Sequence, residues 1–232
     1  MKKIVSLIAI LSFLISCNNT KSGSMVVKGN IDGLKKGTLY LQKFNDTILV
    51  SIDSIELNSE STFKLVDDIE TPEIYYLVLD KKSDQKIMFF GEKGEITITS
   101  KLSKFATSAK ITGSKNQTLL EEHNAMAQKF SGKKLDLFKE KFDAKKIGDT
   151  ALVSKIEKQE TNLIKRKYYY STNFAVNNGD YEVAPYIALT DLYYANIKLL
   201  DTVNNSLSKN VKASKYGLKL NDFIEGIKKN EN

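Results

Sequence analysis

The stretch VVKGNIDGLKKGTLYLQK, residues 26–43, decides the fold of the first half of the chain. Two short runs suited to β-strands, 26–31 and 38–43, flank a polar connection. Glycine supplies the positive φ angles that tight connections and bulges need, and we assign this role to the glycines at positions 29, 33 and 37. The pattern predicts that the two runs pair as a β-hairpin.

Runs of the same kind continue to residue 112, each broken by glycine, asparagine or aspartate. They predict strands at 47–57, 61–66, 73–79, 85–90, 95–100 and 109–112. The alternation in the first of these runs shifts phase near Asp53, which predicts a bulge or bend. About eight short strands at this spacing are typical of an antiparallel sandwich or an open barrel.

The periodicity becomes helical at Ser114. Ser114 and Gln117 have the spacing of a capping box, in which Gln117 would reach back to the backbone of Ser114. We expect Gly132 to end or kink this first helix and a short second helix to close near Gly148. A long third helix is expected over roughly 150–177, because its apolar residues follow one face.

A further helix is expected over 182–200, with Pro185 tolerated in its first turn. Residues 203–229 predict a pair of amphipathic helices, whose lysines we interpret as a solvated face in preference to a membrane-binding one. The fold class is therefore α+β. An N-terminal β-sandwich or open-barrel domain at 25–113 precedes a C-terminal α-helical arm or bundle at 114–232.

The first residues have the parts of a secretory signal. Lys2 and Lys3 precede an apolar run at 4–15, which is shorter than the roughly 20 residues that a membrane-spanning helix needs. Residues 14–17, Leu-Ile-Ser-Cys, resemble the bacterial lipobox, whose cysteine receives a diacylglyceryl group on its sulfur. The alternative is an ordinary signal peptide with an incidental cysteine nearby.

The lipobox resemblance implies a lipoprotein signal peptide at 1–16, a lipid on Cys17 and a flexible polar tether at 17–24. Cys17 is the sole cysteine, so neither a disulfide nor a Cys-x-x-Cys pair can form within one chain. The tether has no acidic cluster of the kind that resembles a surface-export signal in related bacteria. We therefore expect a bacterial cell-envelope protein, held by its lipid on the outer membrane and facing the periplasm.

The charge of the chain comes almost entirely from lysine. The formal net charge is +7, and Arg166 is the sole arginine. Arginine is the residue usually used for bidentate recognition of phosphates and bases. We therefore do not expect nucleic-acid binding.

Candidate functional side chains are few. His123 is the sole histidine, and the sequence shows no nucleophile or second metal ligand beside it, so we interpret it as a packing residue and expect no metal or cofactor. Tyrosine is frequent at interfaces, and the candidates for a ligand or partner surface are Tyr168, Tyr170, Tyr193 and Tyr194. Packing within the helices is the alternative role for these tyrosines. We identify no catalytic residue.

A series of turn and strand residues runs in one order through the first half of the chain. It comprises Val27, Gly29, Ile31, Gly33, Leu34, Gly37, Leu39, Tyr40 and Leu41, then Asp53-Ser54-Ile55, Phe63, Pro72, Tyr75, Phe89-Phe90, Gly94, Ile96, Ile98, Ile111 and Gly113-Ser114. Over roughly residues 25–120 this series resembles the "domain of unknown function 4369" family of Bacteroidota lipoproteins.

In that family the β domain and a helical arm usually precede a thioredoxin-like domain of the TlpA and ResA type. Residues 183–187 and 214–220 resemble the last helices before that domain. The reductase activity cannot be carried over, because the chain has no Cys-x-x-Cys motif. We expect a non-catalytic, lipid-anchored module that binds an envelope partner or ligand. The alternatives are an accessory subunit of a thioredoxin-like reductase system and an envelope hydrolase whose carboxylates the sequence does not identify.

Overall fold

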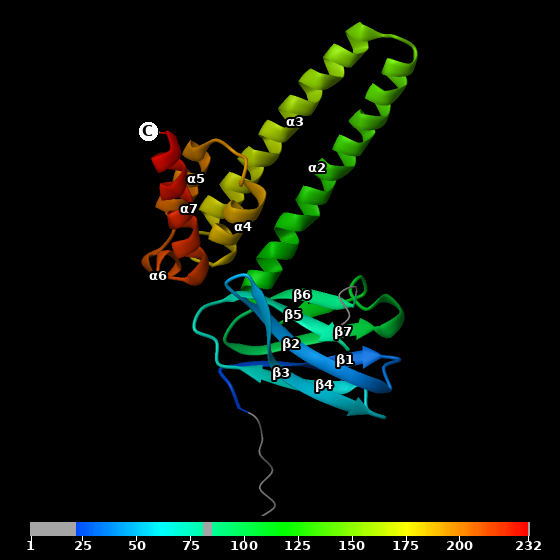
Figure 1. Ribbon diagram of the computed structural model, residues 1–232, viewed down its shortest axis with the longest axis vertical. Helices are drawn as coiled ribbons and strands as arrows, with labels where there is room; N and C mark the ends of the chain where they lie inside the picture. The colour runs from blue at the N-terminus through cyan, green and yellow to red at the C-terminus, as the bar shows by residue number, and fades with distance from the viewer. Residues whose placement is uncertain (1–21, 81–84, 232) are drawn as a thin grey trace, which may run out of the picture.

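The computed structural model describes residues 22–80 and 85–231, in which a β-sandwich carries a group of helices (Figure 1). The expected signal peptide and Cys17 lie outside the described residues. The first sheet has the order β4 (Thr62–Asp67), β1 (Met25–Asp32), β7 (Gly94–Lys101), β8 (Lys110–Thr112). The second has the order β3 (Ile48–Asn58), β2 (Lys36–Asn45), β5 (Glu73–Leu79), β6 (Lys86–Gly91). The sandwich of short strands followed by helices that the sequence predicts is confirmed.

The predicted hairpin between the first two strands is wrong. β1 and β2 belong to different sheets, and β1 pairs antiparallel with β4 and parallel with β7. Each of the two strands has one fully buried apolar row, for example Val27 in β1 and Leu39 in β2. Placing the strands in opposite sheets lets both rows enter the same core, whereas a hairpin would put them in one layer.

The bulge expected near Asp53 is present. The register of β2 against β3 shifts where Leu41 faces Asp53 and Gln42 faces Ser51, so that Ile52 has no partner. The displaced Asp53 accepts a hydrogen bond from the Val66 amide of β4 at 3.0 Å. The bulge therefore turns β3 toward the other sheet and closes one corner of the sandwich.

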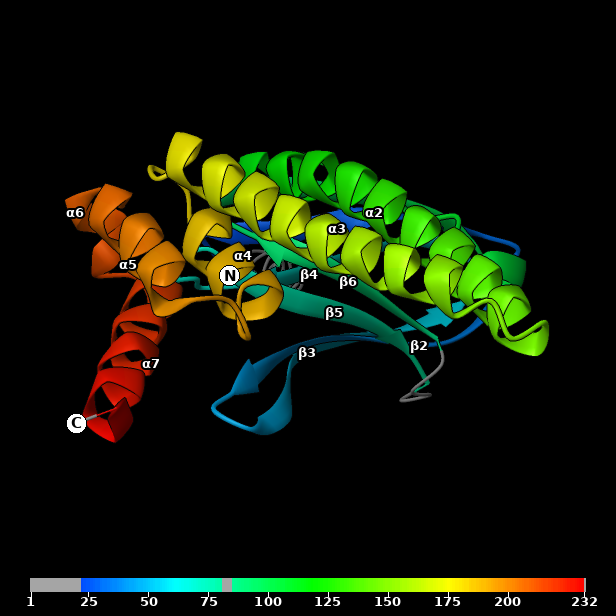
Figure 2. The ribbon, with the colours of Figure 1, turned by 90° about the horizontal axis from the view of Figure 1, so that it is seen from above.

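Two long helices, α2 (Lys115–Lys146) and α3 (Thr150–Asn177), form an antiparallel hairpin that rises from the sandwich (Figures 1 and 2). Ser114 caps α2 by accepting a hydrogen bond from the Gln117 amide at 3.0 Å. Asp149 caps α3 in the same way through the Leu152 amide at 2.9 Å. Both helix starts that the sequence predicts are confirmed.

The expected break at Gly132 is wrong, because α2 continues through it to Lys146. A glycine inside a helix costs about 1 kcal/mol. Beyond it, the buried cluster of Leu137, Ala144 and Ile156 joins α2 to α3, and this packing offsets the cost. The chain turns at Gly148, where φ is 73°.

The single helix expected over 182–200 is also wrong. The chain forms α4 (Val183–Asp191) and α5 (Ile197–Ser206), because the Asn196 side chain accepts a hydrogen bond from the Lys198 amide and starts a new helix. Pro185 lies in the first turn of α4, as expected. The remaining residues form the one-turn α6 (Lys209–Lys212) and the longer α7 (Lys215–Glu231). Among the described residues, no helix combines the length and apolarity needed to cross a membrane.

Candidate functional site

Phe90 of β6 is the point where the sandwich meets the helices. Its side chain is fully buried and makes edge-to-face contacts with Tyr186 of α4 and Tyr216 of α7, at ring distances of 5.6 and 5.9 Å. Its amide donates to the Gln117 side chain of α2 at 2.9 Å. Gln117 therefore does not reach back to Ser114 as the sequence suggested. One strand residue thus contacts three helices and fixes their position.

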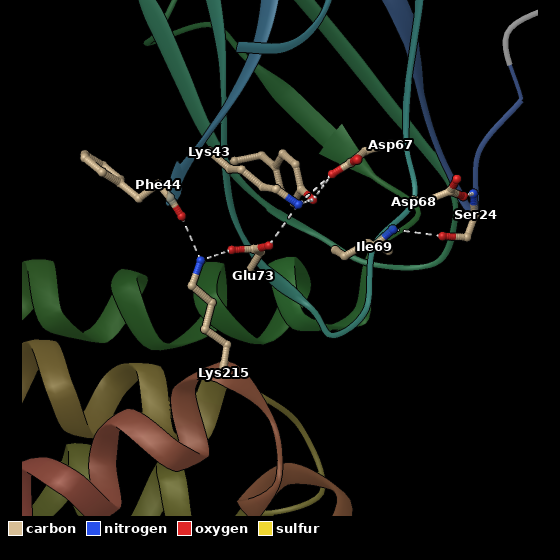
Figure 3. Close-up of polar contacts among 9 residues, drawn as sticks. Ser24, Lys43, Phe44, Asp67, Asp68, Ile69, Glu73 and Lys215 are labelled. Atoms are coloured by element: carbon tan, nitrogen blue, oxygen red, sulfur yellow. Dashed lines mark hydrogen bonds and ion pairs between the residues drawn. The ribbon is translucent and has the colours of Figure 1, made fainter. Parts of the chain in front are cut away.

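A charged cluster supports the same junction (Figure 3). We call Lys43, Asp67, Glu73, Tyr75 and Lys215 the junction cluster. Lys43 of β2 lies 2.8 Å from Asp67 and 3.3 Å from Glu73, while Tyr75 donates to Asp67 at 2.5 Å. Lys215 of α7 pairs with the same Glu73 and also donates to a backbone carbonyl of β2. Glu73 thereby joins a lysine of the sandwich to a lysine of the helices.

The surroundings of the junction cluster shift the pKa values of three of its side chains. Burial works against ionisation of Asp67, but the hydrogen bonds from Lys43 and Tyr75 outweigh it and lower the pKa of the Asp67 carboxyl. Burial also works against the charge of Lys43, yet its acidic neighbours raise the pKa of the Lys43 amine. Burial and the adjacent Asp67 raise the pKa of the Tyr75 hydroxyl. These shifts keep Asp67 and Lys43 charged at neutral pH, as in a structural ion-pair network.

Residues 183–187 and 214–220 meet at this junction. Tyr186 and Tyr216 contact each other with ring centroids 5.2 Å apart, and the Tyr216 hydroxyl accepts a hydrogen bond from the Ile74 amide at 3.0 Å. A Cβ on Gly217 would lie 2.0 Å from the Val211 carbonyl oxygen. Tyr186 and Tyr216 therefore pack α4 and α7 against the sandwich, and Gly217 allows α7 to start close to the backbone of α6.

A hollow lies beside the helical hairpin, where α2 and α3 meet the end of α4. Its volume is about 320 Å³. We call it the hairpin hollow, and its walls are Phe130, Ser131, Lys134, Leu163, Ile164, Lys167, Tyr168, Thr190, Asp191 and Tyr194. Lys167 and Asp191 form an ion pair of 3.2 Å in its wall. Apolar, aromatic and charged groups therefore face one space.

The hollow brings together two of the four candidate tyrosines. Tyr168 and Tyr194 line it. Tyr170 stacks on His123 at 5.5 Å, and Tyr193 stacks on Phe223 at 4.9 Å, so both of these take part in packing between side chains. The neighbouring Tyr169 is 59% exposed and is not part of the wall.

His123 is a buried residue, as the sequence suggested, but it has polar neighbours that the sequence did not reveal. Its Nε2 atom lies 3.0 Å from the Ser171 hydroxyl and 3.5 Å from the Asp191 carboxylate. A hydrolytic triad needs the acid on the other ring nitrogen and an accessible serine, whereas Ser171 is fully buried. Burial lowers the pKa of His123 although Asp191 opposes this. His123 therefore contacts Asp191, one of the residues that line the hairpin hollow.

Two carboxylates approach each other at the base of α2. The Asn116 side-chain amide donates to Glu92 at 2.8 Å and to Glu182 at 3.3 Å, and burial raises the pKa of Glu182. Glu92 also accepts hydrogen bonds from the Lys115 and Asn116 amides, at 2.7 and 3.1 Å. Its oxygens therefore bind the free amides at the start of α2, which is a helix-capping role.

The part of the chain that the structure describes contains no group of three or more histidine, cysteine, aspartate or glutamate side chains able to hold a metal ion. The groups that face the hairpin hollow are suited to contacts through aromatic surface, hydrogen bonds and single charges.

The fold and the hollow define a class of protein in which a two-sheet β-sandwich carries a projecting helical hairpin. Residues 25–120 match the model of the family described as "Domain of unknown function (DUF4369)". The match covers the sandwich together with the start of α2, as the sequence resemblance predicted. No curated protein and no solved structure matches the chain.

Proposed function

We propose that this protein is a lipid-anchored module of the bacterial cell envelope that binds a partner or ligand in the hairpin hollow without catalysing a reaction. The observation that carries the proposal is the meeting of Tyr168, Tyr194 and the Lys167–Asp191 ion pair around one hollow. Lys167 and Tyr168 lie on α3, Asp191 is the last residue of α4, and Tyr194 lies in the turn that follows it.

The chemistry of the hollow suits an amphiphilic occupant. Phe130, Leu163 and the two tyrosines offer apolar surface, and tyrosine adds contact area at a low cost in conformational entropy. Lys134 and the Lys167–Asp191 pair offer charged groups at the same place. A partner segment or small ligand with an apolar body and polar edges fits this combination.

The anchor is tested by changing the proposed lipid attachment site. Cys17→Ser removes the sulfur that would carry the diacylglyceryl group, and several acyl chains are what make such an attachment durable. We expect the variant protein to leave the membrane fraction of cells that retain the unchanged protein there. Membrane retention of Cys17→Ser at the unchanged level would contradict lipid anchoring.

The hollow is tested by comparing two tyrosines of similar chemistry. Tyr194 is 86% exposed and lines the hollow, whereas Tyr169 is exposed outside it. We expect Tyr194→Ala to lower the yield of a crosslinked partner or ligand by about tenfold, since a tyrosine at the centre of an interface often contributes 1–2 kcal/mol or more. The measurement is crosslinking in intact cells followed by pulldown of the anchored protein. Tyr169→Ala is the matched control, and an equal loss in both variants would argue against the hollow.

A second candidate function is an accessory role beside a separate thioredoxin-like reductase. It is favoured by the contact between Tyr186 and Tyr216, because this contact joins the two segments that resemble the helices preceding such a domain. The same pulldown distinguishes the two functions. A partner with a Cys-x-x-Cys domain supports the accessory role, and a partner without one supports an independent binding module.

A further inference from the structure

The far part of α2 carries an apolar stripe that faces away from the hairpin. Leu135, Phe138 and Phe142 are 53, 59 and 53% exposed. Their spacing of three and four residues places them on one face of the helix, within about 60° of one another at about 100° of turn per residue. We call these three residues the distal stripe. The hairpin does not need them for its own packing, because Leu137, Ala144 and Ile156 form the contact with α3.

Charge is segregated around the distal stripe. At about 100° per residue, four lysines lie within about 75° of its centre and the acidic residues of the same turns lie more than about 100° away. The lysines are Lys134, Lys139, Lys145 and Lys146, and the acidic residues are Asp136, Glu140 and Asp143. The amine of Lys146 lies 4.4 Å from the centre of the Phe142 ring and also 3.9 Å from the Asp143 carboxylate, in a solvent-exposed ion pair. The surface therefore presents apolar side chains edged by positive charge.

This charge pattern selects among the possible occupants. Pairing with the same stripe of a second copy would place lysines against lysines, which is unfavourable. The stripe is about 10 Å long on the helix axis, which is small for a protein interface of about 800 Å² on each partner. A helix with Phe and Leu on one face and lysines at its edges is suited to the boundary between lipid headgroups and acyl chains.

We propose that the distal stripe docks on an anionic lipid surface, with its aromatic side chains among the acyl chains and its lysines at the headgroups. The stripe lies in the part of the hairpin that projects from the sandwich, at the end of the molecule opposite to where the described chain begins (Figure 1). It is therefore a lipid contact separate from the proposed lipid on Cys17. The inference does not depend on the hairpin hollow.

The test uses residues 18–232, which contain every described strand and helix and all the hydrophobic clusters, and so keep the folding unit without signal peptide or lipid. The probe is a vesicle of phosphatidylcholine with or without phosphatidylglycerol. We expect binding to the vesicles with phosphatidylglycerol, and binding about tenfold weaker to those without it. Rising salt concentration should weaken the binding.

Two variants separate the apolar contribution from the charge contribution. Phe138→Ser with Phe142→Ser should reduce vesicle binding by about tenfold or more. Lys139→Gln with Lys146→Gln should remove the preference for phosphatidylglycerol. The matched control is Ile48→Ser with Leu49→Ser, which changes two exposed apolar residues of β3 and should leave binding unchanged. Circular dichroism verifies that each variant is folded.

Several results would overturn the proposal. These are no binding to phosphatidylglycerol vesicles, equal binding by the folded Phe138/Phe142 variant, or an equal loss in the Ile48/Leu49 control. Binding of the stripe to an acidic protein, without any binding to vesicles, would identify a protein partner instead and would also overturn it.

Discussion

Replacing Phe90 by alanine is expected to lower the free energy of unfolding by about 3–5 kcal/mol, the usual cost of removing a fully buried phenylalanine. The loss is large because the same ring contacts Tyr186 and Tyr216 and lies in a cluster with Leu119 and Leu120 of α2. The cavity therefore opens between the sandwich and the helices. Urea denaturation followed by circular dichroism measures the change.

The matched control for this prediction is Met88→Ala on the same strand. Met88 is 41% exposed, so its truncation should cost about 1 kcal/mol or less. A similar, small effect for both variants would show that Phe90 does not hold the two parts of the molecule together.

Replacing Gly29 by alanine is expected to destabilise the sandwich by about 3 kcal/mol or more, through overlap with the backbone. A Cβ at this position would lie 1.7 Å from the carbonyl oxygen of Ile98, the residue opposite Gly29 in the parallel β1–β7 pair. The obstacle is a strand backbone and not a flexible side chain. The strands would have to separate, and the central pairing of the first sheet would weaken. Thermal and urea denaturation both report this change.

Gly132→Ala is the same substitution at a position with open space. A Cβ there meets no atom within 4 Å, and α2 is regular through Gly132. Alanine is favoured over glycine inside a helix, so stability should rise by about 0.5–1 kcal/mol. Opposite signs at Gly29 and Gly132 would show that close backbone approach determines which glycine is required.

The positions of the strands could be predicted because alternation is a local property of the sequence. The pairing of the strands could not be predicted. The partner strand β7 lies far from β1 in sequence, and the pairing depends on how both sheets bury their apolar rows in one core. Gly29 shows the same limit. The sequence suggested a turn or bulge, whereas the structure places it inside β1, against Ile98. The glycines at 33 and 37 do have the positive φ angles expected of a connection.

Helix starts were predictable where a capping side chain marks them, as at Ser114 and Asp149. Helix ends were harder to predict, because the packing of α2 against α3 keeps the chain helical through Gly132. The candidate site follows the same rule. The tyrosines were visible as residue types, but only the folded chain shows that Tyr168 and Tyr194 share a hollow. Ser171 lies far from His123 in sequence, so no local pattern could reveal their contact.

The parallel pairing of β1 with β7 also determines the order in which the sandwich can assemble. Val26 lies opposite Glu95 and Asp32 opposite Lys101, so this pairing joins segments on the order of 70 residues apart, and such non-local contacts slow folding. The second sheet joins strands that are closer in sequence, beginning with the β2–β3 pair. We infer that the second sheet forms first and that the pairing of β1 with β7 is among the last steps of folding.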